Sequence, residues 1–215
     1  DVCWNPFNVT HVVSPVRCNS DVLFKVTPKR YVMGIWLASG SERRAQILQD
    51  RYGAVHIESL PGVDETPPTG SVSSQVLAIC RRKAEAVPEE HGYQAVIVAD
   101  TMVGDPDDAN AAMGKADDET GALSMLKRLS GRRHQVWSAT GIQICGDWTF
   151  FVEFAVVDVD ELSIEQLGKL IESGSWKGKA GSYDLAGQMG RHAKLIDGDE
   201  VTVLGFAASA LRLLD

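Results

Sequence analysis

The segment Ala95–Ala99 constrains the fold most, because its residues are all apolar and the run ends at Asp100. An unbroken apolar run of this length is typical of a strand that is buried on both faces of a sheet. From Gly34 onward, strand and helix patterns alternate, which predicts an α/β domain over residues 34–215. Residues 1–33 contain three prolines and no sustained period. We therefore expect an N-terminal extension there, partly ordered or flexible.

Further elements can be placed by their periodicity. We expect a helix capped by Ser39 or Ser41 and stopped by Gly53, and further helices over residues 72–87, 117–129, 162–173 and 207–214. Two β-rich runs, 135–145 and 148–159, predict a hairpin at Gly146-Asp147, and a second hairpin is expected around residues 197–199. We expect a loop rich in proline, glycine and threonine over residues 60–71 and a loop rich in glycine and lysine over residues 177–190.

Composition excludes some classes of function. The net charge of −8 argues against a protein that binds nucleic-acid polymers, since such affinity rests on a basic surface. No apolar run reaches the roughly 20 residues of a membrane span, so no membrane partner is expected. The scattered cysteines (Cys3, Cys18, Cys80 and Cys145) lack metal-ligand spacing. They indicate buried thiols in a reducing compartment, which predicts a cytoplasmic location.

The octapeptide Leu37–Arg44 follows an apolar run with a Gly/Ser turn and then two arginines. Arg43 and Arg44 fall in the first turn of the expected helix, where cations are disfavoured because unpaired N–H groups make that end electropositive. This arrangement favours an anion site, and phosphate is the anion that we expect there. The alternative is an exposed basic helix, since the penalty is only about 0.3–1 kcal/mol per charge.

Two residues carry further chemistry. Asp100 ends the buried strand, and ligands of open α/β sheets collect beyond the carboxyl ends of strands. Its carboxylate would bind a metal or act as a general base, or else serve as a turn residue or helix cap. Lys83 lies on the helix face of Val72, Val76 and Ile79, so its ammonium either meets a partner or reaches water along that face.

The loop pair Asp64-Glu65 is either a solvated turn or a source of oxygen ligands. Together with Asp100 it would suit Mg²⁺ or Mn²⁺. Lys115 carries little local signal, and His134, which follows two arginines, is expected at the surface. The sequence contains no nucleophile elbow, Walker A loop or GxGxxG motif. Metal-assisted attack of water on a phosphate is compatible with what remains.

Taken in order, these pieces resemble the Maf family, also called septum-formation-inhibitor-like or nucleoside triphosphate pyrophosphatase. The resemblance covers about residues 35–214 and rests on Leu37-Ala38-Ser39-x-Ser41-x-Arg43-Arg44, Asp64-Glu65, Arg82-Lys83-Ala84, Ala99-Asp100-Thr101, Gly114-Lys115, Leu129-Ser130-Gly131-x-x-His134-x-Val136 and Lys179-Ala180-Gly181-x-Tyr183.

The resemblance implies a two-lobed α/β fold, with a mixed sheet flanked by helices around a central cleft, similar to inosine triphosphate pyrophosphatases. It implies hydrolysis of a nucleoside triphosphate to the monophosphate and pyrophosphate with a divalent metal, in a house-cleaning role. By match, Asp100 takes the catalytic carboxylate position and Glu65 joins it as metal ligand. The positions for substrate binding and catalytic support fall on Ser39, Arg44, Glu65, Lys83 and Lys115, and those linked to base choice on Arg43 and Thr101.

Arg43 and Thr101 resemble the branch of the family that acts on dTTP and UTP. One departure bears on the base. The family's Tyr-Gly-Ile-Gln-Gly reads Tyr183-Asp184-Leu185-Ala186-Gly187 here, so Ala186 replaces a glutamine, and Gln188 takes its place if the loop is shifted. The alternatives are a non-catalytic, nucleotide-binding regulator of cell division and a hydrolase of another phosphorylated metabolite. A homodimer would be consistent with the family.

Overall fold

A computed structural model describes residues 32–215, with side chains from residue 34 onward. Apart from its last two residues, the predicted N-terminal extension lies outside the described residues. The elements in chain order are β1 (Val32–Leu37), α1 (Glu42–Tyr52), β2 (Val55–Ile57), α2 (Val72–Glu85), β3 (Tyr93–Asp105), β4 (Asp108–Met113), α3 (Glu119–Leu129), β5 (Arg133–Ile144), β6 (Asp147–Val159), α4 (Ile164–Glu172), the 3₁₀ helix η1 (Gln188–Arg191), β7 (Ala193–Asp197), α5 (Glu200–Leu204) and α6 (Ala208–Leu214).

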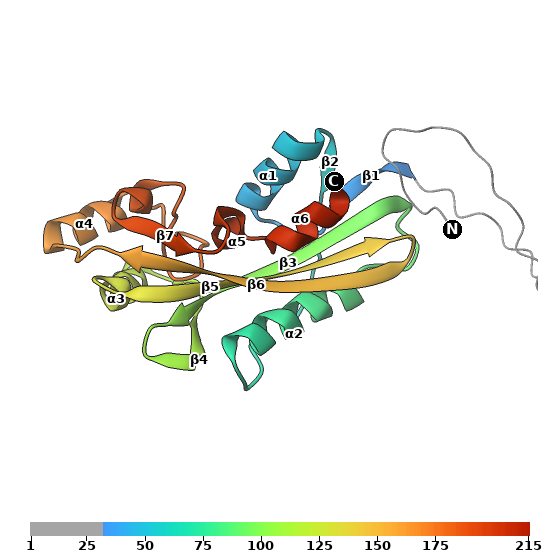
Figure 1. Cartoon of the computed structure of the whole chain (residues 1–215). Helices are drawn as coiled ribbons and strands as arrows, with labels where there is room; N and C mark the ends of the chain where they lie inside the picture. The colour runs from blue at the N-terminus through green and yellow to red at the C-terminus, as the bar shows by residue number, and fades with distance from the viewer. Residues whose placement is uncertain (1–31) are drawn as a thin grey trace, which may run out of the picture.

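One mixed sheet organises the described chain (Figure 1). Its order is β2-β1-β3-β5-β6-β7, and β4 pairs with β3 outside this path. Strand β1 runs parallel to β2 and β3, whereas β4, β5, β6 and β7 pair antiparallel to their neighbours. Helices flank the sheet, so the predicted α/β class with a mixed sheet is confirmed.

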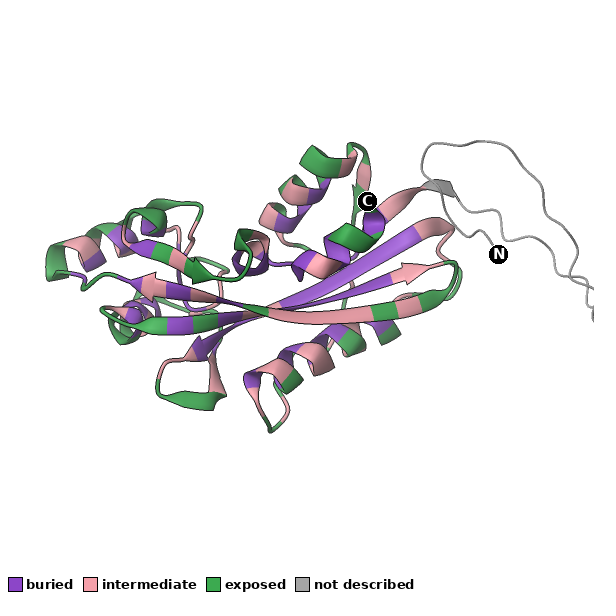
Figure 2. Cartoon of the chain, in the orientation of Figure 1, coloured by how far each residue is buried: buried purple, intermediate pink, exposed green. Residues whose placement is uncertain are grey.

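Strand β3 is buried on both faces, as its apolar run predicts (Figure 2). Val96 and Val98 pack with α2 on one face, whereas Ala95, Ile97 and Ala99 pack with α1 and α6 on the other. This alternation follows from the two-residue period of a strand. The strand therefore separates two helical layers, and the residues that follow Ala99 continue the alternation.

A third apolar cluster fills the opposite end of the molecule, where α3, α4 and η1 cover β5 and β6. Leu126 and Leu129 of α3 and Leu167 of α4 are buried there. The long strands β3, β5 and β6 connect this end with the end that carries α1, α2 and α6 (Figure 1). The helices thus gather into two lobes that share one sheet.

One edge of β3 changes partner along its length. The last residue of β1 pairs with Ile97, and the pairing with β4 begins at Val103. The Ala38 N–H extends the first ladder by donating to the Ile97 carbonyl at 2.8 Å. Asp100 and Thr101 therefore lie in the gap between β1 and β4, beyond the carboxyl end of β1, which is where ligands collect in sheets of this kind.

Local signals were mostly correct. Ser41 is the N-cap of α1, and its hydroxyl accepts from the Arg44 N–H. The expected β5–β6 hairpin is present, but its turn is Cys145-Gly146, one residue earlier than predicted, because Ile144 pairs with Asp147. The second expected hairpin is wrong, because β7 ends at Asp197, pairs with β6 and leads directly into α5. An Asp-Gly-Asp turn serves a strand-to-helix connection as readily as a hairpin.

Two expectations about single side chains need correction or restriction. His134 is buried rather than exposed, with 4% of its surface accessible. Cys80 is the buried free thiol that was expected, but Cys145 is disulfide-bonded, so the prediction of reduced thiols holds only for Cys80 among the described cysteines. None of the helices in residues 32–215 has both the length and the apolar character needed to cross a membrane.

Candidate active site

A cavity of about 700 Å³ opens at the edge of β3 between the two lobes. This volume is within the roughly 300–1,000 Å³ range of small-molecule sites. Its walls come from the start of α1, the end of α2, the centre of β3 and the loops around residues 59–65, 177–185 and 203–205. The lining includes these predicted site residues: Ser39, Arg43, Arg44, Glu65, Lys83, Asp100, Thr101 and Lys115.

Lys83 bridges two carboxylates at one end of the cavity. Its Nζ lies 2.8 Å from Asp100 Oδ1 and 3.0 Å from Glu65 Oε1, and it also donates to the Ala99 carbonyl at 3.4 Å. The Lys83 and Asp100 side chains are only 11% and 12% exposed. The apolar face of α2 therefore ends in a lysine because its ammonium meets a buried carboxylate, the first of the two predicted roles.

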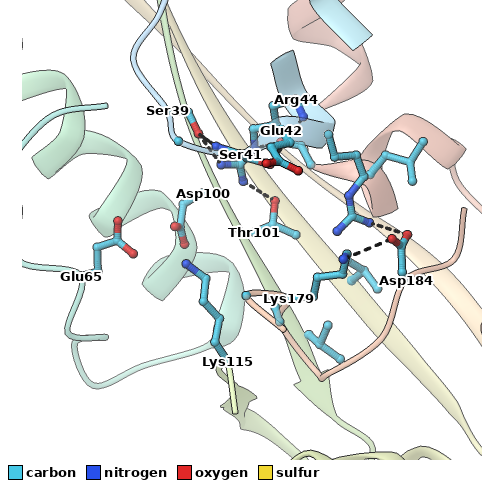
Figure 3. Close-up of a pocket in the computed structure, with 18 of the residues that line it drawn as sticks. Ser39, Ser41, Glu42, Arg44, Glu65, Asp100, Thr101, Lys115, Lys179 and Asp184 are labelled. Atoms are coloured by element: carbon cyan, nitrogen blue, oxygen red, sulfur yellow. Dashed lines mark hydrogen bonds and ion pairs between the residues drawn. The ribbon is translucent and has the colours of Figure 1, made fainter. Parts of the chain in front are cut away.

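Glu65 and Lys115 complete this end of the cavity. Burial opposes ionisation of Glu65, but Lys83, and more weakly Lys115 and Arg44, hold its pKa below the ordinary value. Lys115 forms an isolated antiparallel bridge with Ala180, and its side chain points toward the space beside Asp100 and Glu65 (Figure 3). The Glu65 carboxylate is thus ionised at neutral pH, and Lys115 lies beside it without a salt bridge to any of the described residues.

The donor set bears on metal binding. No group of three or more metal-ligating side chains occurs among the described residues. Glu65 and Asp100 nevertheless present two carboxylates within 3.0 Å of one shared cation, Lys83. Mg²⁺ commonly uses one or two carboxylates and completes its shell with waters and substrate phosphates. The residues present therefore fit a hard divalent cation of this kind.

Arg44 is a buried fork with three oxygen partners. Its Nε donates to the Gly205 carbonyl at 2.8 Å, one terminal nitrogen to Ser39 Oγ at 3.2 Å, and the other to Thr101 Oγ1 at 2.8 Å. Burial lowers the pKa of the Arg44 guanidinium, and the Asp100 carboxylate opposes that shift. Three hydrogen bonds therefore hold the Arg44 guanidinium in one position in the lining of the cavity.

A chain of hydroxyl groups supports this fork from behind. Ser138 Oγ donates to the Thr202 carbonyl at 2.7 Å and lies 2.9 Å from Thr101 Oγ1. Since the Ser138 proton is used on Thr202, Thr101 donates to Ser138 and accepts from Arg44. Thr101 thus takes a definite rotamer, which the sequence alone did not indicate.

A second ion-pair group lies on the other side of Arg44 (Figure 3). Asp184 Oδ1 lies 3.3 Å from an Arg43 terminal nitrogen, and Asp184 Oδ2 lies 3.3 Å from Lys179 Nζ. Sequence reasoning quoted Asp184 and Lys179 only as parts of motifs and gave them no role. The available signal was an acidic residue in a loop that is otherwise rich in lysine and glycine.

His134 and Tyr183 form a buried contact behind this loop. His134 Nε2 lies 2.7 Å from the Tyr183 hydroxyl, and the two rings meet edge to face. Burial lowers the pKa of His134 to about 4 and raises the pKa of Tyr183. This neutral pair fixes the residue that immediately precedes Asp184.

Gln188 is the one predicted site residue that the structure does not bring to the cavity. It is exposed in η1 and is absent from the lining, as is Ala186. The loop presents Tyr183, Asp184 and Leu185 to the cavity instead. The chain turns away after Leu185, so an exchange of roles between Ala186 and Gln188 has no support in this geometry.

Comparison with known proteins adds a family and several relatives. The family model described as "Maf-like protein" matches residues 34–214. The dTTP/UTP pyrophosphatase of Zymomonas mobilis is 35% identical over 172 residues, which cover 79% of this chain and 83% of that protein. The dTTP/UTP pyrophosphatase of Koribacter versatilis is 35% identical over 180 residues, which cover 80% of this chain and 88% of that protein.

Among solved structures, the Ham1 protein of Staphylococcus aureus matches with a TM-score of 0.41 at 13% identity, covering 59% of this chain and 71% of that one. A HAM1 protein from Coxiella burnetii matches with a TM-score of 0.40 at 13% identity, covering 60% and 73%.

Proposed function

Because the chain belongs to the Maf-like protein family, we propose that its cleft hydrolyses a nucleoside triphosphate of the dTTP or UTP type to the monophosphate and pyrophosphate. The relatives named above share this activity, and from them we infer that the chain is a hydrolase of nucleoside triphosphates. The observation that carries the proposal is the buried Lys83–Asp100 pair, which stands beside Arg44 in a cavity large enough for a nucleotide.

The cationic side chains and Asp100 have different roles in the proposed reaction. Arg44, Lys83 and Lys115 line the cavity and would neutralise the negative charge of the triphosphate. Asp100 Oδ1 accepts from Lys83, which leaves Oδ2 to orient a water and take its proton. The water oxygen attacks the α-phosphorus in line, the bond from that phosphorus to the α–β bridging oxygen breaks, and pyrophosphate leaves with the bond's electron pair.

A divalent metal belongs to this proposal. Glu65 and Asp100 would hold Mg²⁺ or Mn²⁺, which supplies charge neutralisation at phosphate oxygens when bound. Lys83 lies within 3.0 Å of both carboxylates and so holds them on the same side of the cavity. The house-cleaning role, a homodimer and a cytoplasmic location stay predictions.

The decisive experiment compares the wild type with Asp100→Asn. Pyrophosphate release is measured across a nucleotide panel with Mg²⁺, with Mn²⁺ and after chelation. We expect turnover of dTTP or UTP with metal, and a loss of at least about a hundredfold in Asp100→Asn with the fold intact by circular dichroism. Asp50→Asn, an exposed change on α1, is the matched control.

Three outcomes would contradict the proposal. Near-wild-type turnover in Asp100→Asn would remove Asp100 from the role of base. Binding of nucleotides without turnover of any of them would favour the non-catalytic regulator instead, and strong hydrolysis of a sugar phosphate without nucleotide turnover would favour another metabolite.

A further inference from the structure

Asp184 holds two cations at the side of the cleft away from the Lys83–Asp100 pair (Figure 3). One carboxylate oxygen meets Arg43 and the other meets Lys179, each at 3.3 Å. The Asp184 side chain is 19% exposed, and all three residues line the cavity. The carboxylate is therefore placed where a bound molecule would touch it.

The ion pair with Asp184 orients the Arg43 side chain. Its Nε is buried without a hydrogen-bond partner, and among the described residues its ion pair is with Asp184. Arg44, the next residue, is held by three oxygens that do not involve Asp184. A change at Asp184 would therefore release Arg43 and leave the Arg44 fork in place.

The charges on this side favour a neutral ligand group over a phosphate. Arg43 and Lys179 are already paired with the same carboxylate, so a phosphate would have to displace Asp184 to reach them. A base edge that carries a carbonyl beside an N–H can bind the pair as it stands, since Arg43 donates and Asp184 accepts. The triphosphate then lies toward Lys83 and Lys115, where the catalytic carboxylate is.

We infer that Asp184 is a specificity residue that accepts a hydrogen bond from the ring N–H of the base, while Arg43 donates to the adjacent carbonyl. This inference rests on the proposed function. Uracil and thymine carry a ring N–H beside a carbonyl. Cytosine has an unprotonated ring nitrogen beside its carbonyl, and that lone pair would face the carboxylate. The pair therefore selects uracil or thymine against cytosine by leaving an unmatched acceptor in the complex with cytosine.

The test uses UTP and CTP, which share the sugar and the triphosphate and differ only in the ring. The ratio of kcat/KM for UTP to kcat/KM for CTP is measured for the wild type, Asp184→Asn and the control Asp50→Asn. An asparagine offers a donor as well as an acceptor. We expect the ratio to fall at least about tenfold in Asp184→Asn, the scale of one hydrogen bond to a charged group, and to stay unchanged in Asp50→Asn.

A second arm needs no variant and therefore does not depend on the folding of Asp184→Asn. N3-methyl-UTP lacks the ring N–H, and the wild type should use it at least about tenfold less well than UTP. Inhibition of UTP turnover by inorganic triphosphate supplies the phosphate control. It should be no weaker in Asp184→Asn than in the wild type, because the triphosphate lies toward Lys83 and Lys115 and does not need the Asp184 carboxylate.

Several results would overturn the inference. An unchanged UTP-to-CTP ratio, or an equal fall for both nucleotides, would reduce Asp184 to a structural role. Weaker inhibition by inorganic triphosphate in Asp184→Asn would show that the variant disturbs the phosphate side of the cleft, so that its effect is not confined to the base. If the wild type hydrolyses no nucleotide, the proposed function fails by itself. The ratio of the UTP and CTP dissociation constants, measured by calorimetry, then decides for or against Asp184.

Discussion

Arg44 offers the sharpest test of the site's architecture, because Arg44→Lys keeps the charge and removes the fork. The guanidinium donates to Ser39 Oγ, Thr101 Oγ1 and the Gly205 carbonyl. A lysine ammonium at the end of a flexible chain can replace about one of these contacts. Each hydrogen bond to a charged group contributes about 1.5–3 kcal/mol, so the loss of two predicts a destabilisation of about 3 kcal/mol or more.

Arg43→Lys is the matched control at the neighbouring position. Arg43 makes one partly exposed ion pair, with side chains 26% and 19% exposed, and a lysine can keep it. We expect its cost to stay below about 1 kcal/mol.

Urea unfolding measures both variants. With a slope of about 2 kcal/mol per M, the midpoint should fall by about 1.5 M in Arg44→Lys and by less than about 0.5 M in Arg43→Lys. Equal shifts in the two variants would refute the fork argument. No nucleotide is needed, so this result is independent of the proposed function.

Two further predictions concern stability. Burial lowers the pKa of His134 to about 4, from an unfolded value near 6.5. The stability that depends on neutral His134 is therefore fully present above about pH 6.5. As the pH falls from there toward 4, the free energy of unfolding should decrease by about 3 kcal/mol. His134→Gln should flatten the unfolding free energy across that window, and parallel pH profiles would contradict this. A Cβ at Gly205, where φ is +126°, would lie 2.8 Å from Arg44 Nε. Gly205→Ala should therefore lower the thermal midpoint more than Gly146→Ala, because Gly146 also has a positive φ but a Cβ there would meet no atom within 4 Å. Equal shifts in the two variants would show that Arg44 is not displaced.

Sequence patterns predicted well what is local. The apolar run that ends at Asp100 and the helical phase of Lys83 each follow from a period of one element. The structure then joins these two residues at 2.8 Å. Thr101 and Lys115 carried little local signal of this kind, and only the resemblance to a family pointed to them.

The parts that were missed depend on contacts between distant segments. Asp184 contacts Arg43, which lies 141 residues away in the sequence. Asp184 belongs to a loop, and a loop has no helical or strand periodicity from which the direction of its side chains could be predicted. His134 was misplaced because its arginine neighbours suggested a surface. In β5, however, His134, Val136 and Ser138 are all buried, so strand alternation was the better guide.

The two-residue period of β3 also explains why the site has two different walls. Asp100 continues the face that carries Val96 and Val98, so it meets Lys83 of α2. Thr101 continues the opposite face, so it meets Arg44 of α1. Both can be reached from one cavity because the edge of β3 is uncovered between its pairing with β1 and with β4. The order Asp-Thr is therefore required as well as the two residue types, since the reverse order would set a carboxylate beside the Arg44 fork and leave Lys83 without its buried partner.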